Sequence, residues 1–115
     1  MCGITCYLTS NQKLNIIKYI IQSLKVLQNR GYDSAGIGLY NKEKKEFQVE
    51  KIIGKDINTF ESKFDISNFS MGFAHTRWAT HGEVKAANAH PHHSIDNKLY
   101  IVHNGTIDNL DTIKK

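Results

Sequence analysis

The chain has 115 residues, of which 40% are hydrophobic and 23% are charged, as is typical of one globular domain. Its net charge is +4, but the lysines are scattered and form no stripe with aromatic residues, which disfavours nucleic-acid binding. No apolar run approaches the roughly 18 residues of a membrane-spanning helix, and no signal-peptide pattern is present. We therefore expect a cytoplasmic protein with no nucleic-acid or membrane partner.

The first predicted elements are a strand and a helix. Residues 2–8 are rich in β-branched and aromatic side chains, which favour a strand. Ser10 and Asn11 are candidate N-caps of a helix that runs to about Asn29. Its apolar residues recur on one face, as in a helix that packs on a core: Leu14, Ile17, Ile20, Ile21, Leu24 and Leu27.

The next stretch predicts a β-hairpin, with strands at residues 35–40 and 47–53 on either side of a polar turn. Residues 56–64 follow as a short helix with apolar residues on one side, and residues 70–76 follow as another strand. From residue 77 to 97 the sequence is irregular and polar, and a loop of this length in a compact domain is usually functional.

The C-terminal part predicts a short strand at residues 99–103 and a helix that begins near Asp108. Ile107, Leu110 and Ile113 have helical spacing, but the pattern stops at the end of the sequence after barely two turns and without a cap. We therefore expect the chain to be a piece of a longer protein.

Cys2 is the first candidate catalytic residue. Removal of Met1 would leave its thiol beside a free α-amine, whose pKa of roughly 7.7–8.0 suits a general base. On position alone, a buried structural cysteine in the first strand is the more common outcome. Cys6 cannot form a disulfide with Cys2, because along a strand the two would lie about 13 Å apart.

Arg77 is a candidate for binding a carboxylate. Only Arg30 and Arg77 among the 15 basic residues are arginines, and arginine alone can grip a carboxylate with two hydrogen bonds. Arg77 lies in HTRWATHG at 75–82, directly after a predicted strand. So many polar groups at a strand end indicate a binding site more than a surface ion pair.

Asn104 and Gly105 allow two interpretations. After a strand, this pair is typical of a two-residue hairpin turn. Alternatively, the Asn104 amide and the Gly105 N–H could point at one oxygen and form an oxyanion hole. The pair taken alone leaves both open.

The chain has six histidines, which raises the question of a zinc site. Such a site needs ligands that converge from a fixed scaffold, and neither a C-x-x-C pair nor an H-E-x-x-H helix is present. We therefore interpret the histidines as polar loop residues and expect no metal.

Five motifs, in order along the chain, resemble one protein family. They are CGI at 2–4, RGYDSAG at 30–36, HTRWATHG at 75–82, NAHPH at 88–92 and HNG at 103–105. Together they resemble the N-terminal glutaminase domain of the glutamine–fructose-6-phosphate aminotransferase family. These proteins are class II glutamine amidotransferases of the N-terminal-nucleophile (Ntn) hydrolase family, and the resemblance covers essentially all of the chain.

The resemblance implies a role for each residue that matches a family motif. Cys2 would be the nucleophile, its α-amine the base, and Asn104 and Gly105 the oxyanion hole. Arg77 would hold the glutamine α-carboxylate. The surrounding glutamine-binding loop would include Trp78, Thr80 and His81. Three further residues would lie near the nucleophile in less defined roles: Arg30, Tyr32 and Asp33.

The resemblance also implies an α+β fold, the N-terminal part of a four-layer αββα sandwich of antiparallel sheets flanked by helices. Residues 1–115 would be a partial glutaminase domain, without the sugar-phosphate isomerase domains. Glutamine would give glutamate and ammonia through a γ-glutamyl thioester, without a cofactor. An absent domain would pass the ammonia to fructose-6-phosphate for glucosamine-6-phosphate synthesis, and full-length relatives are expected to be homo-oligomers.

One alternative function remains open. No position in the chain matches the family's downstream aspartate, which holds the glutamine α-amine, so we expect little or no turnover if the chain is complete. The alternative is a truncated, catalytically silent paralogue or fragment that acts at most by binding glutamine or a partner chain.

Overall fold

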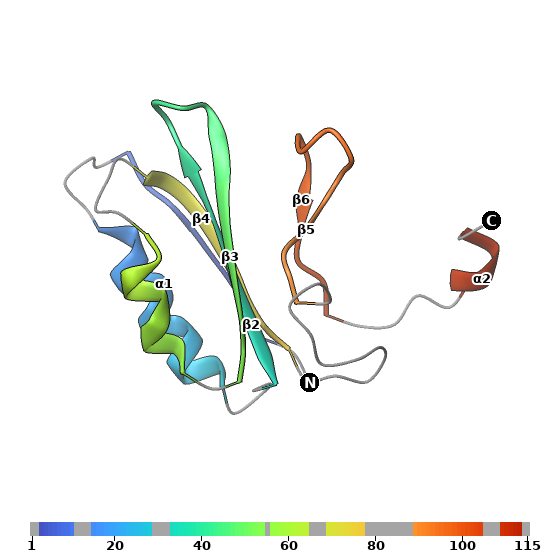
Figure 1. Ribbon diagram of the computed structural model, residues 1–115, viewed down its shortest axis with the longest axis horizontal. Helices are drawn as coiled ribbons and strands as arrows, with labels where there is room; N and C mark the ends of the chain where they lie inside the picture. Colours follow the sequence, from blue (N-terminus) through green and yellow to red (C-terminus); the bar gives the residue numbers. More distant parts are fainter. Residues whose placement is uncertain are drawn as a thin grey trace.

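The computed structural model of the chain describes residues 3–10, 15–28, 33–54, 56–64, 69–77, 89–104 and 109–113. Within these ranges four antiparallel strands form the main sheet, in the order β1-β4-β2-β3 (Figure 1). Their bounds are Gly3–Leu8 (β1), Ser34–Asn41 (β2), Glu46–Ile53 (β3) and Phe69–Arg77 (β4). The four predicted strands in this part of the chain are confirmed, and the antiparallel sheets with few helices form an α+β arrangement.

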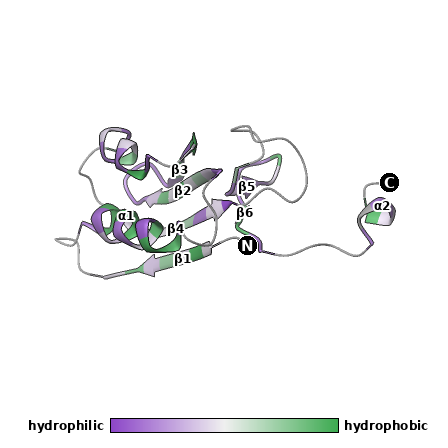
Figure 2. Ribbon diagram, turned by 90° about the horizontal axis from the view of Figure 1, so that it is seen from below, coloured by the Kyte–Doolittle hydropathy of each residue, from purple (hydrophilic) through white to green (hydrophobic). Residues whose placement is uncertain are grey.

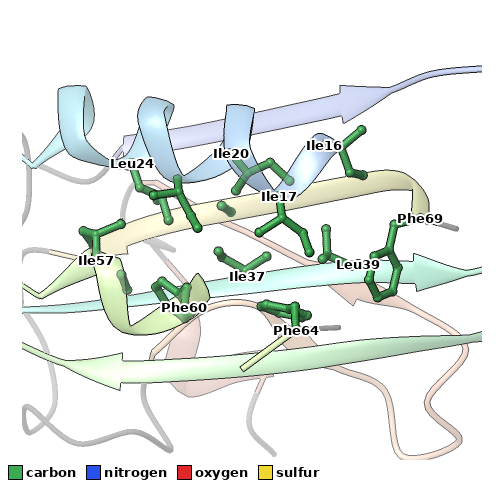
Figure 3. Close-up of a cluster of buried hydrophobic side chains, with 13 residues drawn as sticks. Ile16, Ile17, Ile20, Leu24, Ile37, Leu39, Ile57, Phe60, Phe64 and Phe69 are labelled. Atoms are coloured by element: carbon green, nitrogen blue, oxygen red, sulfur yellow. The ribbon is translucent and has the colours of Figure 1, made fainter. Parts of the chain in front are cut away.

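Helix α1 (Ile16–Leu27) covers one face of the main sheet (Figures 1 and 2). Its buried residues pack against apolar residues of β2, such as Ile37 and Leu39, in one core cluster (Figure 3). The 3-10 turn η1 (Ile57–Ser62) adds Phe60, which is fully buried, to the same cluster. The core therefore lies between the sheet, α1 and η1.

α1 begins later than the sequence predicts. Asn15 is its N-cap residue, with an extended backbone (φ −85°, ψ 91°), so the prediction that Ser10 caps this helix is wrong. The other candidate, Asn11, lies outside the described residues. Asn15 makes no side-chain capping hydrogen bond, whereas Ile16, which was not among the residues predicted for the apolar face, is buried at the first helical position. Packing of the apolar face, more than a cap, therefore accounts for where the helix begins.

The other face of the main sheet is partly covered by residues from 89 onward. β5 (His92–His93) and β6 (Tyr100–Ile101) pair antiparallel as a small second sheet on the opposite side from α1 (Figure 1). Tyr100 packs on Phe47 and Phe73 of the main sheet, with ring centroids 4.5 and 6.3 Å apart. This aromatic contact holds the second sheet against the first.

Three later elements differ in detail from their predictions. The helix predicted at 56–64 is a 3-10 turn over Ile57–Ser62, in which two hydroxyls donate to carbonyls three residues earlier. The strand predicted at 99–103 pairs only at Tyr100–Ile101. α2 (Leu110–Ile113) lies within the predicted last helix, away from the sheets (Figures 1 and 2). No helix in the described ranges is long and apolar enough to span a membrane.

Helix α1 provides a test of the core. Leu24 is fully buried, whereas Val26, two residues later, is 74% exposed. We expect Leu24→Ala to lower the free energy of unfolding by about 2–5 kcal/mol, because it removes buried methyl groups and leaves a cavity. Val26→Ala should change it by less than about 0.5 kcal/mol. Urea unfolding of both variants checks this, and equal effects would contradict the packing.

Candidate active site at one end of the main sheet

β1 and β2 begin, and β4 ends, at the same end of the main sheet. Gly3 pairs with Thr76, and Ser34 pairs with Arg77. The N–H of Asp33 donates to the C=O of Arg77 at 3.0 Å. Two residues that the sequence placed in one site are thus joined through their backbones.

This end of the sheet is marked by polar side chains that are buried. Among the described residues, the buried polar or charged residues are Ser34, His75, Thr76 and Arg77. All four lie in the last three positions of β4 or directly opposite its end in β2. Polar groups are seldom buried without hydrogen-bonding partners, and such clusters often have a functional role. The cluster therefore identifies this end of the sheet as the candidate site.

Successive side chains of a strand point to opposite faces of the sheet, so neighbouring residues of β4 lie on different faces. Thr76 faces α1, where its hydroxyl donates to the C=O of Leu27 at 3.3 Å. His75 faces the other way and stacks on His90, with ring centroids 4.0 Å apart and planes 24° apart. Arg77, two residues after His75, follows on the same face. The candidate site therefore lies on the face away from α1.

His90 reaches β4 because Gly36 of β2 has no side chain. Gly36 pairs with His75 in the sheet. A Cβ on Gly36 would overlap the carbonyl oxygen of His90 and would lie 3.1 Å from Cδ of Pro91. The backbone at 90–91 therefore crosses the sheet in direct contact with β2, and this crossing places the His90 ring on His75.

Burial lowers the pKa values of the histidines in this cluster. Loss of hydration lowers the pKa of His75 to about 4, and the nearby positive charge of Arg77 acts in the same direction. The pKa of His90 falls to about 3, first because the ring is buried and then because it lies against His75. Burial also lowers the pKa of His92. All three imidazoles are therefore neutral at pH 7.

Asn104 is exposed, and the residue before it is bonded to both stacked rings. Nε2 of His75 donates to the C=O of His103 at 2.8 Å. The N–H of His103 donates to Nδ1 of His90 at 3.3 Å. The structure thus joins the segment before Asn104 to β4, two residues from Arg77.

The remaining predicted site residues lie outside the described part of the chain: Cys2, Arg30, Tyr32, Trp78, Thr80, His81 and Gly105. Four of these are chain neighbours of residues already placed. Cys2 is bonded to Gly3, and Tyr32 is bonded to Asp33. Trp78 follows Arg77, and Gly105 follows Asn104.

Sequence reasoning missed His75 and His90 as parts of the site. His75 was placed in the strand predicted at 70–76, but neither histidine was given a part in the site, whereas His75 is fully buried at this end of β4. One signal was available in the sequence. His75 alternates with the small residues Ala74 and Thr76, so a buried strand here puts its ring on the face opposite the core.

The histidine cluster does not form a metal centre in the part of the chain that the structure describes. No three His, Cys, Asp or Glu side chains there are arranged to hold a metal ion. His90 packs against His92 with ring centroids 4.4 Å apart, and against His75 in a stack. Stacked rings do not direct their nitrogen atoms at one shared point, as a tetrahedral site requires.

Comparison with curated proteins shows what the chain resembles. It is 44% identical over 117 residues to the isomerizing glutamine–fructose-6-phosphate aminotransferase of Bacteroides thetaiotaomicron. It is 42% identical, also over 117 residues, to those of Francisella tularensis and Helicobacter pylori. Each match takes in the whole chain.

This chain is a relative of the isomerizing glutamine–fructose-6-phosphate aminotransferases. It spans 18% of the length of these three aminotransferases. No family model matches the chain. The resemblance found from the motifs is confirmed by identity that extends over all of its residues.

The crossing at Gly36 provides a test of how the site is built. We expect Gly36→Ala to move residues 90–91 off β2 and to cost about 1–3 kcal/mol of folding free energy, because a Cβ has no room there. Gly54→Ala is the control: it has open space but a φ of +96°, so only the backbone is strained. NMR should show shifted His90 ring resonances in Gly36→Ala alone. Equal shifts in both variants would contradict the contact.

The lowered histidine pKa values predict how stability depends on pH. Unfolded histidines titrate near 6.5, so between about pH 6.5 and 4 the unfolded chain binds protons that folded His75 does not. The free energy of unfolding should therefore fall as pH falls through this window, on the order of 2–3 kcal/mol for His75. Urea unfolding at several pH values measures the slope. His75→Gln should flatten it, and an unchanged slope in that variant would contradict the prediction.

Proposed function

We propose that this chain carries the nucleophile side of a glutamine-hydrolysing site. The observation that best supports this is the convergence at one end of the main sheet. β4 ends there at Arg77, β1 begins there at Gly3, and the segment before Asn104 is bonded to β4. Because Cys2 is bonded to Gly3, a thiol, an amide donor and a guanidinium would meet at this end.

The proposed chemistry is acyl transfer to Cys2. Its sulfur attacks the carboxamide carbon of glutamine while the thiol proton passes to the α-amine left by removal of Met1. The carbonyl oxygen becomes an oxyanion that accepts hydrogen bonds from the Asn104 side chain and the Gly105 N–H. Transfer of the proton to the amide nitrogen releases ammonia and leaves a γ-glutamyl thioester, which water hydrolyses to glutamate.

Arg77 would select the substrate by its α-carboxylate. Its side chain is only 7% exposed, and charge-assisted hydrogen bonds are stronger where water is excluded. The imidazoles of His75, His90 and His92 are neutral at pH 7. They therefore neither compete with Arg77 for a carboxylate nor repel it. Trp78, Thr80 and His81 would complete the glutamine-binding loop.

The proposal extends in two ways beyond this end of the sheet. The relatives are named for transfer from glutamine to fructose-6-phosphate, so we propose that the ammonia is used for glucosamine-6-phosphate synthesis on another domain. We also propose that the α1 layer and the main sheet are half of a four-layer Ntn sandwich. In that arrangement the second sheet, begun by β5 and β6, would be completed by further chain.

A glutamine-like chloroketone provides the test, because docking as glutamine does would make it alkylate Cys2 much faster than an ordinary exposed thiol. We expect it to modify Cys2 in a saturable way, with protection by L-glutamine. Cys6, which is a free and exposed thiol, is the internal control. Arg77→Lys should slow labelling at low reagent by about ten- to a hundredfold, because two charge-assisted hydrogen bonds are lost.

Peptide mass mapping and the intact mass give the results. Equal modification of Cys2 and Cys6, or no protection by L-glutamine, would contradict the proposal. Retention of Met1 would also contradict it, because the α-amine would be blocked. These outcomes would favour the alternative of a catalytically silent relative.

A further inference from the structure

The peptide of His103 is held from both sides by two stacked imidazoles. Its C=O accepts a hydrogen bond from Nε2 of His75 at 2.8 Å, and its N–H donates to Nδ1 of His90 at 3.3 Å. The two rings lie 4.0 Å apart, one on the other. Strand β6 ends at Ile101, so the ladder of the second sheet does not reach this peptide.

We propose that His75 and His90 form a clamp that positions Asn104, so that its side chain is held toward the end of β4. Neither ring would touch the substrate, and both would act through the His103 backbone. This inference rests on the proposed function, since it takes Asn104 to be a donor to the oxyanion.

The two hydrogen bonds fix the tautomer of each ring. A carbonyl oxygen only accepts, so His75 must carry its proton on Nε2. A backbone N–H only donates, so Nδ1 of His90 must keep its lone pair, with the proton on Nε2. A protonated His90 would lose this acceptor. Burial favours the neutral forms that the clamp requires.

The clamp is anchored on rigid parts of the fold. His75 is fully buried in β4, which is paired on both sides. His90 is held by the contact of its backbone with Gly36 and by packing of its ring on His92. Nδ1 of His75 has no hydrogen-bond partner among the described residues. The structure thus leaves one buried polar atom unsatisfied while Nε2 holds the His103 carbonyl.

Matched substitutions can separate the clamp from general packing. Glutamine places an amide N–H where histidine has Nε2, and asparagine places a carbonyl oxygen where histidine has Nδ1. His75→Gln and His90→Asn therefore keep the required group, whereas His75→Asn and His90→Gln do not. The same two side chains are used at both positions with opposite expected results, so a nonspecific effect of either one would be recognised.

The functional measurement is acylation of Cys2 in the full chain by L-γ-glutamyl-p-nitroanilide, followed by the burst of released p-nitroaniline. We expect His75→Gln and His90→Asn to keep the saturating rate within about threefold. His75→Asn and His90→Gln should lower it at least about tenfold. Complete removal of an oxyanion donor lowers a rate by about 10²–10³-fold, and these variants would only misplace the donor. The half-saturating concentration should not change, because the carboxylate grip of Arg77 is untouched. Equal rates in all four variants would overturn the clamp.

A measurement without substrate distinguishes failure of the clamp from failure of the proposed function. In ¹⁵N-labelled chain, a scalar coupling between the His103 amide nitrogen and Nδ1 of His90 reports the hydrogen bond directly. Its absence would overturn the clamp, as would unchanged Asn104 amide resonances in a folded His75→Asn variant. A chain that shows the coupling and the Asn104 shifts but no burst would instead contradict the proposed function and leave the clamp standing.

Discussion

The candidate site depends on the pairing of β4 with a neighbour on each side. β1 pairs with one edge of β4 and β2 with the other, so hydrogen bonds fix its backbone up to its last residues. Because side chains alternate between the two faces of a strand, Thr76 faces α1, whereas His75 and Arg77 lie on the opposite face. A guanidinium at the end of such a strand has a defined position relative to the residue that begins β1. Strand pairing alone fixes this relative position, without contacts from a loop.

A second constraint brings distant parts of the sequence to this strand end. The backbone at His90 can lie on β2 only because Gly36, more than fifty residues earlier, has no side chain. The same crossing places the His90 ring where it accepts from the His103 peptide. Thus a glycine in one strand determines where a later irregular segment runs. The hydrogen bonds of His103 in turn join the segment before Asn104 to His75 of β4 and to His90.

The sequence predicted the main sheet well because its strands carry local signals, such as the β-branched and aromatic side chains of residues 2–8. It also found the buried face of α1, but not its first residue, because Asn15 ends the extended segment without a side-chain cap. Arg77 was predicted to bind a carboxylate from its chemistry and its place after a predicted strand. The structure places it, buried, at the end of β4, and its role stays a prediction. The position of His90 could not be predicted this way, since it depends on contacts with Gly36 and His103 that lie far away in sequence.

The buried histidines and Arg77 share one electrostatic requirement. A guanidinium keeps its charge, so protonated rings beside it would repel it in a poorly hydrated place. Burial keeps the rings of His75 and His90 neutral, and only a neutral imidazole has both a donor and an acceptor nitrogen. The His103 peptide requires one of each. Burial that keeps the rings uncharged beside Arg77 is therefore also what allows them to hold the segment before Asn104.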